Sequence, residues 1–128
     1  MERALTALLG DTLLSAAVVV YLGAYSDSWR ERAVAEWASL VRAAGVPGSS
    51  EYSFAKVMGS AVIRRQWLMN GLPSASYEGA LIMQHSRKWP LFIDPQTQGN
   101  RWLKREYPKL HIARPKDSDL LRNFENCL

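Results

Sequence analysis

The chain has 128 residues, a mass of 14.4 kDa and a net charge of +4, which suits one domain or part of a larger one. A hydrophobic content of 48% is ample for a core, and a single cysteine excludes an intrachain disulfide. The charge is only mildly basic, so composition by itself does not identify a nucleic-acid-binding protein.

The first predicted element is a helix over residues 3–22. Apolar side chains recur there at helical spacing, and from Leu13 onward they lie on nearly every side, which predicts a deeply buried helix. The apolar run from Leu13 to Ala24 is too short to span a bilayer, so we predict no transmembrane segment.

A second helix is predicted over residues 29–44. Ser28 and Glu31 have the spacing of a capping box. In this motif the side chain of each residue accepts a hydrogen bond from the backbone N–H of the other. Apolar residues then follow one stripe of the helix, and Gly45 marks its end.

Shorter helices are predicted next. Residues 54–58 suit one or two helical turns, and Ser60 is expected to cap a helix that stops before Gly71. Residues 74–79 are small and polar, which predicts a loop, whereas residues 80–83 fit a helix or a strand equally well.

The stretch from Trp89 to Lys104 predicts a strand, a turn and a helix. Residues 91–93 are a short apolar run between two prolines, which is typical of a strand buried on both faces. Gly99 supplies the permissive backbone of a turn, and residues 100–106 are good helix formers. This is the layout of a phosphate-binding loop in a nucleotide-binding fold, although a plain strand–helix turn fits the pattern equally well.

The residues that would bind phosphate in such a loop are missing. A working loop has the form G-x-x-x-x-G-K-[ST], in which the lysine reaches the β- and γ-phosphates and the Ser or Thr holds Mg²⁺. On this chain Asp94 takes the place of the first glycine, Gly99 the second, Asn100 the lysine and Arg101 the Ser or Thr. Asp94 brings negative charge to the phosphate position, and a guanidinium has no lone pair to offer a metal ion.

The candidate site is therefore a degenerate nucleotide-binding loop, with no catalytic residue and no metal ligand expected. Its residues are Asp94, Pro95, Gln96, Thr97, Gln98, Gly99, Asn100 and Arg101.

Two more elements are predicted before the chain ends: a second strand over 110–113 and a last helix over 119–128, capped by Ser118. Two strands alone make a poorly covered sheet, so further strands would lie beyond the last residue. The predicted fold class is α/β. A mostly helical entry region, 1–72, precedes the first part of an incomplete, P-loop-like parallel-sheet domain, 73–128.

A basic stretch from Arg101 to Lys116, with Trp102 and Tyr107 interleaved, could contact nucleic acid. A solvated face is the preferred interpretation, because acidic residues resume at Asp117 and no continuous basic stripe forms.

At this point the sequence resembles a known family. Four stretches are similar to the dynein heavy chain, in the fifth AAA+ module of its motor ring. They are residues 9–14 with 20–25, then 67–73, 87–99 and 121–126. The pattern R-x-W/Y-P-L-x-I-D-P-x-x-Q within 87–99 is highly specific. The axonemal members look closer than the cytoplasmic ones, chiefly for the P-Q-T-Q-G sequence and the downstream Trp102.

The resemblance implies a function for the parent protein. It would be an ATP-driven, minus-end-directed microtubule motor of cilia and flagella, with six AAA+ modules in a ring and a coiled-coil stalk that ends in a microtubule-binding tip. The fifth module is generally regarded as lacking nucleotide turnover. ATP or ADP would therefore be a cofactor of the parent, with none expected on this segment, which would be a structural ring module.

The resemblance also implies partners and a location. The partners would be the neighbouring AAA+ modules and the stalk of the same heavy chain, microtubules through that stalk, and the parent's intermediate and light chains, with no nucleic acid and no membrane. The location would be the cytoplasm, the cytoskeleton and the ciliary axoneme. Two alternatives stay open from the residues alone: a small free-standing nucleotide-binding protein and, less favoured, a nucleic-acid-binding domain.

Overall fold

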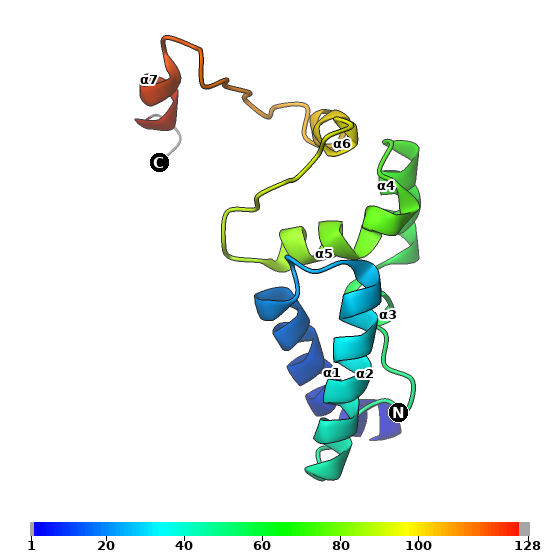
Figure 1. Cartoon of the computed structure of the whole chain (residues 1–128). Helices are drawn as coiled ribbons and strands as arrows, with labels where there is room; N and C mark the ends of the chain where they lie inside the picture. The colour runs from blue at the N-terminus through cyan, green and yellow to red at the C-terminus, as the bar shows by residue number, and fades with distance from the viewer. Residues whose placement is uncertain (1, 126–128) are drawn as a thin grey trace.

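The computed structural model describes residues 2–125, and every regular element in that range is helical. The elements are α1 (Glu2–Tyr21), α2 (Asp27–Ala43), α3 (Phe54–Met58), α4 (Ala61–Met69), the single 3₁₀ turn η1 (Ser74–Ser76), α5 (Tyr77–His85), α6 (Gln98–Glu106) and α7 (Leu120–Glu125). Figure 1 shows α1 and α2 as an antiparallel pair, α5 across one end of that pair, and α6 beyond α5. An extended segment leads from α6 to α7 (Figure 1).

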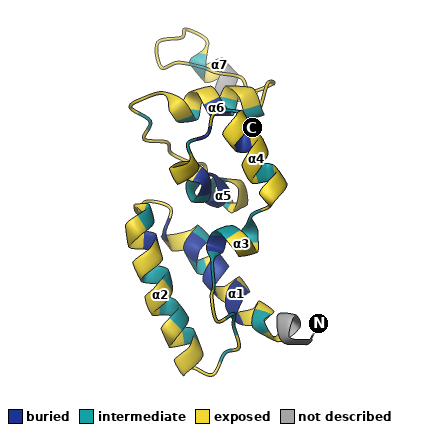
Figure 2. Cartoon of the chain, turned by 90° about the vertical axis from the view of Figure 1, so that its right-hand side faces the viewer, coloured by how far each residue is buried: buried dark blue, intermediate teal, exposed yellow. Residues whose placement is uncertain are grey.

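The core is built around α5, which contributes more buried apolar residues than any other helix described. Figure 2 shows buried residues gathered on α5 and on the faces of α1 and α3 that look toward it. Aromatic rings extend this core to α6. The Trp67 ring lies 5.7 Å from the Tyr77 ring and 5.4 Å from that of Trp102, the latter in an edge-to-face arrangement.

The first helix is confirmed in place but is less buried than predicted. From residue 6 onward, where side-chain burial is described, the buried apolar residues of α1 are Leu14 and Val18, and Leu22 just after the helix is also buried. Apolar side chains on its other face are exposed. They are Leu8, Leu9, Leu13, Val20 and Tyr21. The reason is that α2, α3 and α5 cover one side of α1, and no described element covers the other.

Backbone contact fastens α1 to the loop that follows α2. The N–H of Gly10 donates to the Pro47 carbonyl at 2.9 Å, and the Asp11 carboxylate accepts the Ser49 N–H at 2.9 Å and its hydroxyl at 2.5 Å. Glycine is required at position 10, because a Cβ there would lie 2.6 Å from the Pro47 oxygen.

The predicted start of the second helix is wrong by two residues. Ser26 takes the N-cap position and α2 begins at Asp27, so Ser28 lies within the first turn and the capping box with Glu31 does not form. Asp27 instead forms an ion pair with Arg30, one turn along the helix.

The short helices α3 and α4 are confirmed where the sequence placed them. Ser60 does occupy the N-cap position of α4, although its hydroxyl makes no capping hydrogen bond. The predicted loop over 74–79 is wrong in its second half: η1 leads directly into α5 at Tyr77, and residues 80–83 are helical. Tyr77, Ala80 and Leu81 share a buried face, and burying that face outweighs the weak helix propensity of Gly79.

Neither predicted strand forms within residues 2–125, so the sheet that we expected is absent from the described part of the chain. Residues 91–93 belong to neither a helix nor a strand. The side chains of Leu91 and Ile93 are 90% and 92% exposed. A strand is stabilised by hydrogen bonds to a neighbour, and none lies beside this segment or beside 110–113 among the described residues. α7 begins at Leu120, and the end of that predicted helix, 126–128, lies outside the described residues.

No helix of the described range is long and apolar enough to cross a bilayer.

Candidate functional site

The predicted loop, Asp94 to Arg101, connects the extended segment 91–93 to the first turn of α6, which starts at Gln98. The structure brings these residues together around one side chain. The Asp94 carboxylate accepts the N–H of Gln98 through Oδ1 and the N–H of Asn100 through Oδ2, both at 2.9 Å. The Asp94 carbonyl also accepts the Thr97 N–H at 3.1 Å. Asp94 therefore caps the helix from outside it.

The conformational roles within the loop differ from those predicted. The left-handed residue is Thr97, with φ 57°, whereas Gly99 lies within the helical first turn. A Cβ on Gly99 would lie 3.4 Å from Asp94 Oδ2 and 3.6 Å from the Phe92 ring, which is ordinary van der Waals contact. Glycine is therefore not required at this position by backbone conformation or by space.

Arg101 folds back onto the loop that precedes it. Its N–H donates to the Thr97 carbonyl at 3.1 Å, and its Nε donates to the same oxygen at 3.3 Å. Its Nη2 donates to the Gln96 carbonyl at 3.2 Å. The guanidinium thus stabilises the turn and offers no metal ligand.

This arrangement does not fit a bound triphosphate. A helix N-terminus attracts anions through its free N–H groups and its dipole, but here two of those N–H groups already bind the chain's own carboxylate. A phosphate would have to displace Asp94 and then lie beside its negative charge. Within residues 2–125, no group of three or more His, Cys, Asp and Glu side chains is placed to hold a metal ion.

A polar contact that the sequence did not reveal holds α6 in place. The Glu106 carboxylate accepts Trp67 Nε1 at 3.1 Å, Gln66 Nε2 at 3.2 Å and Asn70 Nδ2 at 2.7 Å. One turn earlier, Trp102 is fully buried against Trp67. The i to i+4 spacing of Trp102 and Glu106 puts both on one helix face, and this spacing was the signal that the sequence offered.

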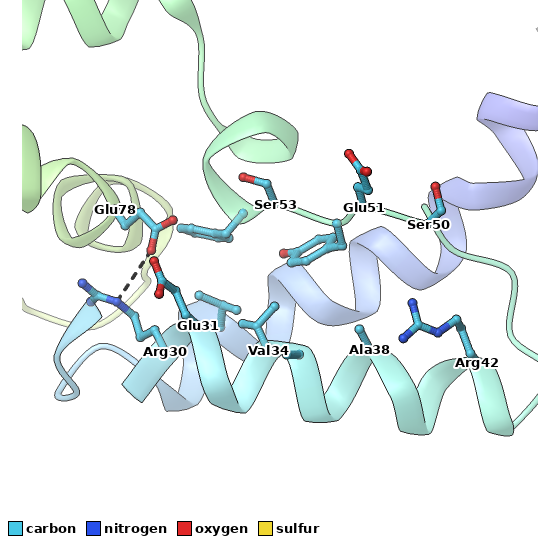
Figure 3. A pocket seen from close by; sticks show the side chains of 13 residues that line it. Arg30, Glu31, Val34, Ala38, Arg42, Ser50, Glu51, Ser53 and Glu78 are labelled. Atoms are coloured by element: carbon cyan, nitrogen blue, oxygen red, sulfur yellow. Dashed lines mark ion pairs between the residues drawn. The ribbon is translucent and has the colours of Figure 1, made fainter. Parts of the chain in front are cut away.

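Sequence reasoning also missed a groove beside α2. It has a volume of about 440 Å³ and lies between α2, segment 50–54 and α5. Figure 3 shows Arg30 and Glu78 at one end of it and Arg42 at the other. We call it the α2 groove. It is remote in sequence from the loop at 94–101 and shares no residue with it.

Comparison with known proteins identifies the family. Residues 65–128 match the family model described as the ATP-binding dynein motor region. Dynein axonemal heavy chain 3 of Mus musculus is 37% identical over 125 residues, which is 94% of this chain and 3% of that protein. Dynein axonemal heavy chain 1 of Rattus norvegicus is 34% identical over 132 residues, or 100% of this chain and 3% of its own length.

A flagellar protein gives the same result. The Dynein-1-beta heavy chain of the flagellar inner arm I1 complex of Chlamydomonas reinhardtii is 34% identical over 131 residues, covering 98% of this chain and 3% of its own. The chain belongs to the dynein heavy chain family, and it spans about 3% of the length of the curated relatives that it matches.

Proposed function

We propose that this chain is part of the fifth AAA+ module of an axonemal dynein heavy chain, and that it acts as a structural element of the motor ring without hydrolysing nucleotide. The single observation that carries the second half of the proposal is Asp94, whose carboxylate occupies the α6 N-terminus. Family membership supports the first half.

The loop geometry explains why turnover is not expected. In a working phosphate-binding loop the backbone N–H groups are open toward the nucleotide, and a lysine and a Ser or Thr complete the site. Here the Asp94 carboxylate accepts two of these N–H groups, so they are not available to a phosphate. Asn100 and Arg101 take the positions of the lysine and of the magnesium ligand. Displacing a helix cap of this kind costs about 1 kcal/mol before any phosphate contact is gained.

The exposed segment before the loop supports a place in a larger assembly. Trp89, Leu91 and Ile93 are 83%, 90% and 92% exposed, which is unusual for three large apolar side chains in five residues. Neighbouring strands of a complete AAA+ core would bury them. In this proposal the segment is a strand that lacks its sheet.

The parent's activity follows from the same proposal. It would be an ATP-driven microtubule motor of the ciliary or flagellar axoneme, and ATP or ADP would bind to other modules. This segment would contact neighbouring AAA+ modules and the stalk of the same heavy chain, and it would reach microtubules and the intermediate and light chains only through the parent.

Two measurements test the proposal. The purified chain should show no ATP turnover and no tight ATP or ADP binding by calorimetry. Saturable, Mg²⁺-dependent hydrolysis that is lost when Asp94 or Gln98 is substituted would contradict it and favour a free-standing nucleotide-binding protein. An immunoblot with an antibody to residues 29–45 should show a very large polypeptide enriched in cilia. A band near 14.4 kDa alone would rule out a motor subunit.

A further inference from the structure

The α2 groove has an apolar middle and charged ends. One wall is the face of α2 that presents Glu31, Val34 and Ala38, and the opposite side is formed by Tyr52 and Phe54. Ala38 lies seven positions after Glu31 on the helix, so the apolar part extends about 10 Å from the acidic end. Figure 3 shows Glu31, Val34 and Ala38 on the side of α2 that faces the groove.

Negative charge is in excess at one end. Asp27 and Glu78 lie close to the guanidinium of Arg30, whose side chain is only 8% exposed, and the charge of Glu31 acts on Glu78. Arg30 forms an ion pair with Asp27, and its Nε lies 3.8 Å from Glu78 Oε2 without a hydrogen bond. Burial raises the pKa of the Glu78 carboxyl, Arg30 lowers it, and the charges of Asp27 and Glu31 raise it again. One cation serves three carboxylates.

A second cation on the first half of α2, Arg32, contacts an aromatic ring instead of the groove. The Arg32 guanidinium lies 4.5 Å from the centre of the Trp29 ring, away from the groove lining. At the far end of the groove Arg42 and Glu51 have opposite charges, so that end has no net attraction for either sign. The acidic end alone therefore selects by charge. Its carboxylates exclude an anionic ligand, and the described residues hold no metal-binding cluster.

We propose that the α2 groove docks a helix from a protein partner, which places one Lys or Arg side chain between Glu31 and Glu78 and apolar side chains against Val34, Ala38 and Tyr52. Because the negative charge is concentrated near α5, the end of the partner helix that carries the Lys or Arg should lie at α5. Insertion of a helical apolar stripe into a groove is a common mode of peptide recognition, and anchor residues about four and seven positions apart match the spacing along α2. This inference does not depend on the function proposed above.

The test uses the whole chain and a synthetic helix about three turns long, with one lysine followed by leucines about four and seven positions later. A matched peptide has glutamate in place of the lysine. NMR titration of the labelled chain should move the amide signals of residues 31–38 and 50–54. The lysine peptide should bind about three- to tenfold more tightly than the glutamate peptide.

Variants then locate the contact. Glu31→Gln with Glu78→Gln should weaken the lysine peptide by about three- to tenfold, and Ala38→Phe should block binding by filling the groove. Glu36→Gln, an exposed position on α2 outside the groove lining, should change nothing. Because Glu78 is half-buried, Glu31→Gln alone serves as the variant that leaves the fold unperturbed.

Three results would overturn the proposal: equal affinity for the two peptides, signal changes confined to the exposed face of α1, or an affinity unaffected by Ala38→Phe. Self-association of the chain that Ala38→Phe abolishes, measured by sedimentation velocity, would assign the groove to a second copy instead.

Discussion

The amide nitrogen of Gly10 lies 2.9 Å from the carbonyl oxygen of Pro47, so the middle of α1 and the loop after α2 meet backbone to backbone. Asp11 adds its two hydrogen bonds to Ser49 beside this contact. Two residues 37 positions apart in the sequence therefore meet through their backbones, and Gly10 places no side chain between them. This contact closes the α1–α2 pair opposite the turn that connects the helices.

Gly10→Ala is expected to destabilise the chain by about 1–3 kcal/mol, because the new methyl group overlaps backbone atoms that cannot rotate away. Its Cβ would lie 2.6 Å from the Pro47 oxygen and 2.9 Å from the Gly48 Cα. Urea denaturation measures the effect. Gly79→Ala is the matched control: it lies in α5 with nothing within 4 Å of a Cβ, so it should stabilise by up to about 1 kcal/mol. Equal effects of the two substitutions would contradict the close approach.

Glu106→Gln should loosen α6 from α4. The carboxylate accepts from Trp67, Gln66 and Asn70, and an amide in its place would turn a donor toward at least one of these donors. We expect a loss of about 1–3 kcal/mol in the free energy of unfolding and a shift in tryptophan fluorescence. Glu125→Gln, on the exposed surface of α7, is the control and should leave both unchanged. An unaltered fluorescence spectrum in Glu106→Gln would disprove the link.

The sequence predicted the elements whose signals are local. α1, α3 and α4 lie where apolar periodicity and glycine or proline stops placed them. α6 begins two residues earlier than predicted, because its cap comes from Asp94, six residues before Asn100. The strand at 91–93 failed because strand formation depends on a neighbour that the described residues do not supply.

In the candidate site, too, the features with local sequence signals could be predicted and those that depend on distant contacts could not. The sequence predicted a turn before α6 and showed that Asp94, Asn100 and Arg101 differ from a working phosphate-binding loop, but it did not show the direction of the Asp94 carboxylate. Glu106 and the α2 groove depend on contacts between distant segments, such as Glu106 with Asn70 or Arg30 with Glu78. The helical spacing at Glu106 indicated which face of α6 it lies on, but no nearby residue indicated the distant partner at either place.

Glu78 is expected to make the stability of the chain fall as pH rises. Its pKa in the folded chain is raised, so between the ordinary value of 4.5 and the folded value the native state binds more protons than the unfolded state. The stabilising contribution of the protonated form is present below the ordinary pKa and is lost as pH rises through the folded one. Urea denaturation of the chain and of Glu78→Gln, at about pH 4 and about pH 7, measures this.

The informative quantity is the difference in stability between the two proteins, because every other ionisable group is the same in both. Relative to the unsubstituted chain, Glu78→Gln should gain stability on going from the acidic to the neutral condition. A difference that does not change with pH would show that burial does not perturb this carboxyl.

Asp94→Gly is the most direct test of why the loop is closed. The substitution removes the cap from α6 and should cost about 1 kcal/mol of stability, since a carboxylate that binds two backbone N–H groups is lost. It also restores glycine at the first position of the phosphate-loop pattern and frees the N–H groups of Gln98 and Asn100. Inorganic phosphate should then shift the NMR signals of these two amides, whereas the unsubstituted chain should show no such shift.

Binding should remain weak in this variant, because Asn100 and Arg101 still replace the lysine and the Mg²⁺ ligand. Asp94→Asn is the intermediate case, since it keeps one acceptor oxygen and loses the negative charge. If phosphate shifted the two amides equally in the unsubstituted chain and in Asp94→Gly, the carboxylate would not be the group that closes the loop. In that case the proposed lack of turnover would have to depend on Asn100 and Arg101 alone.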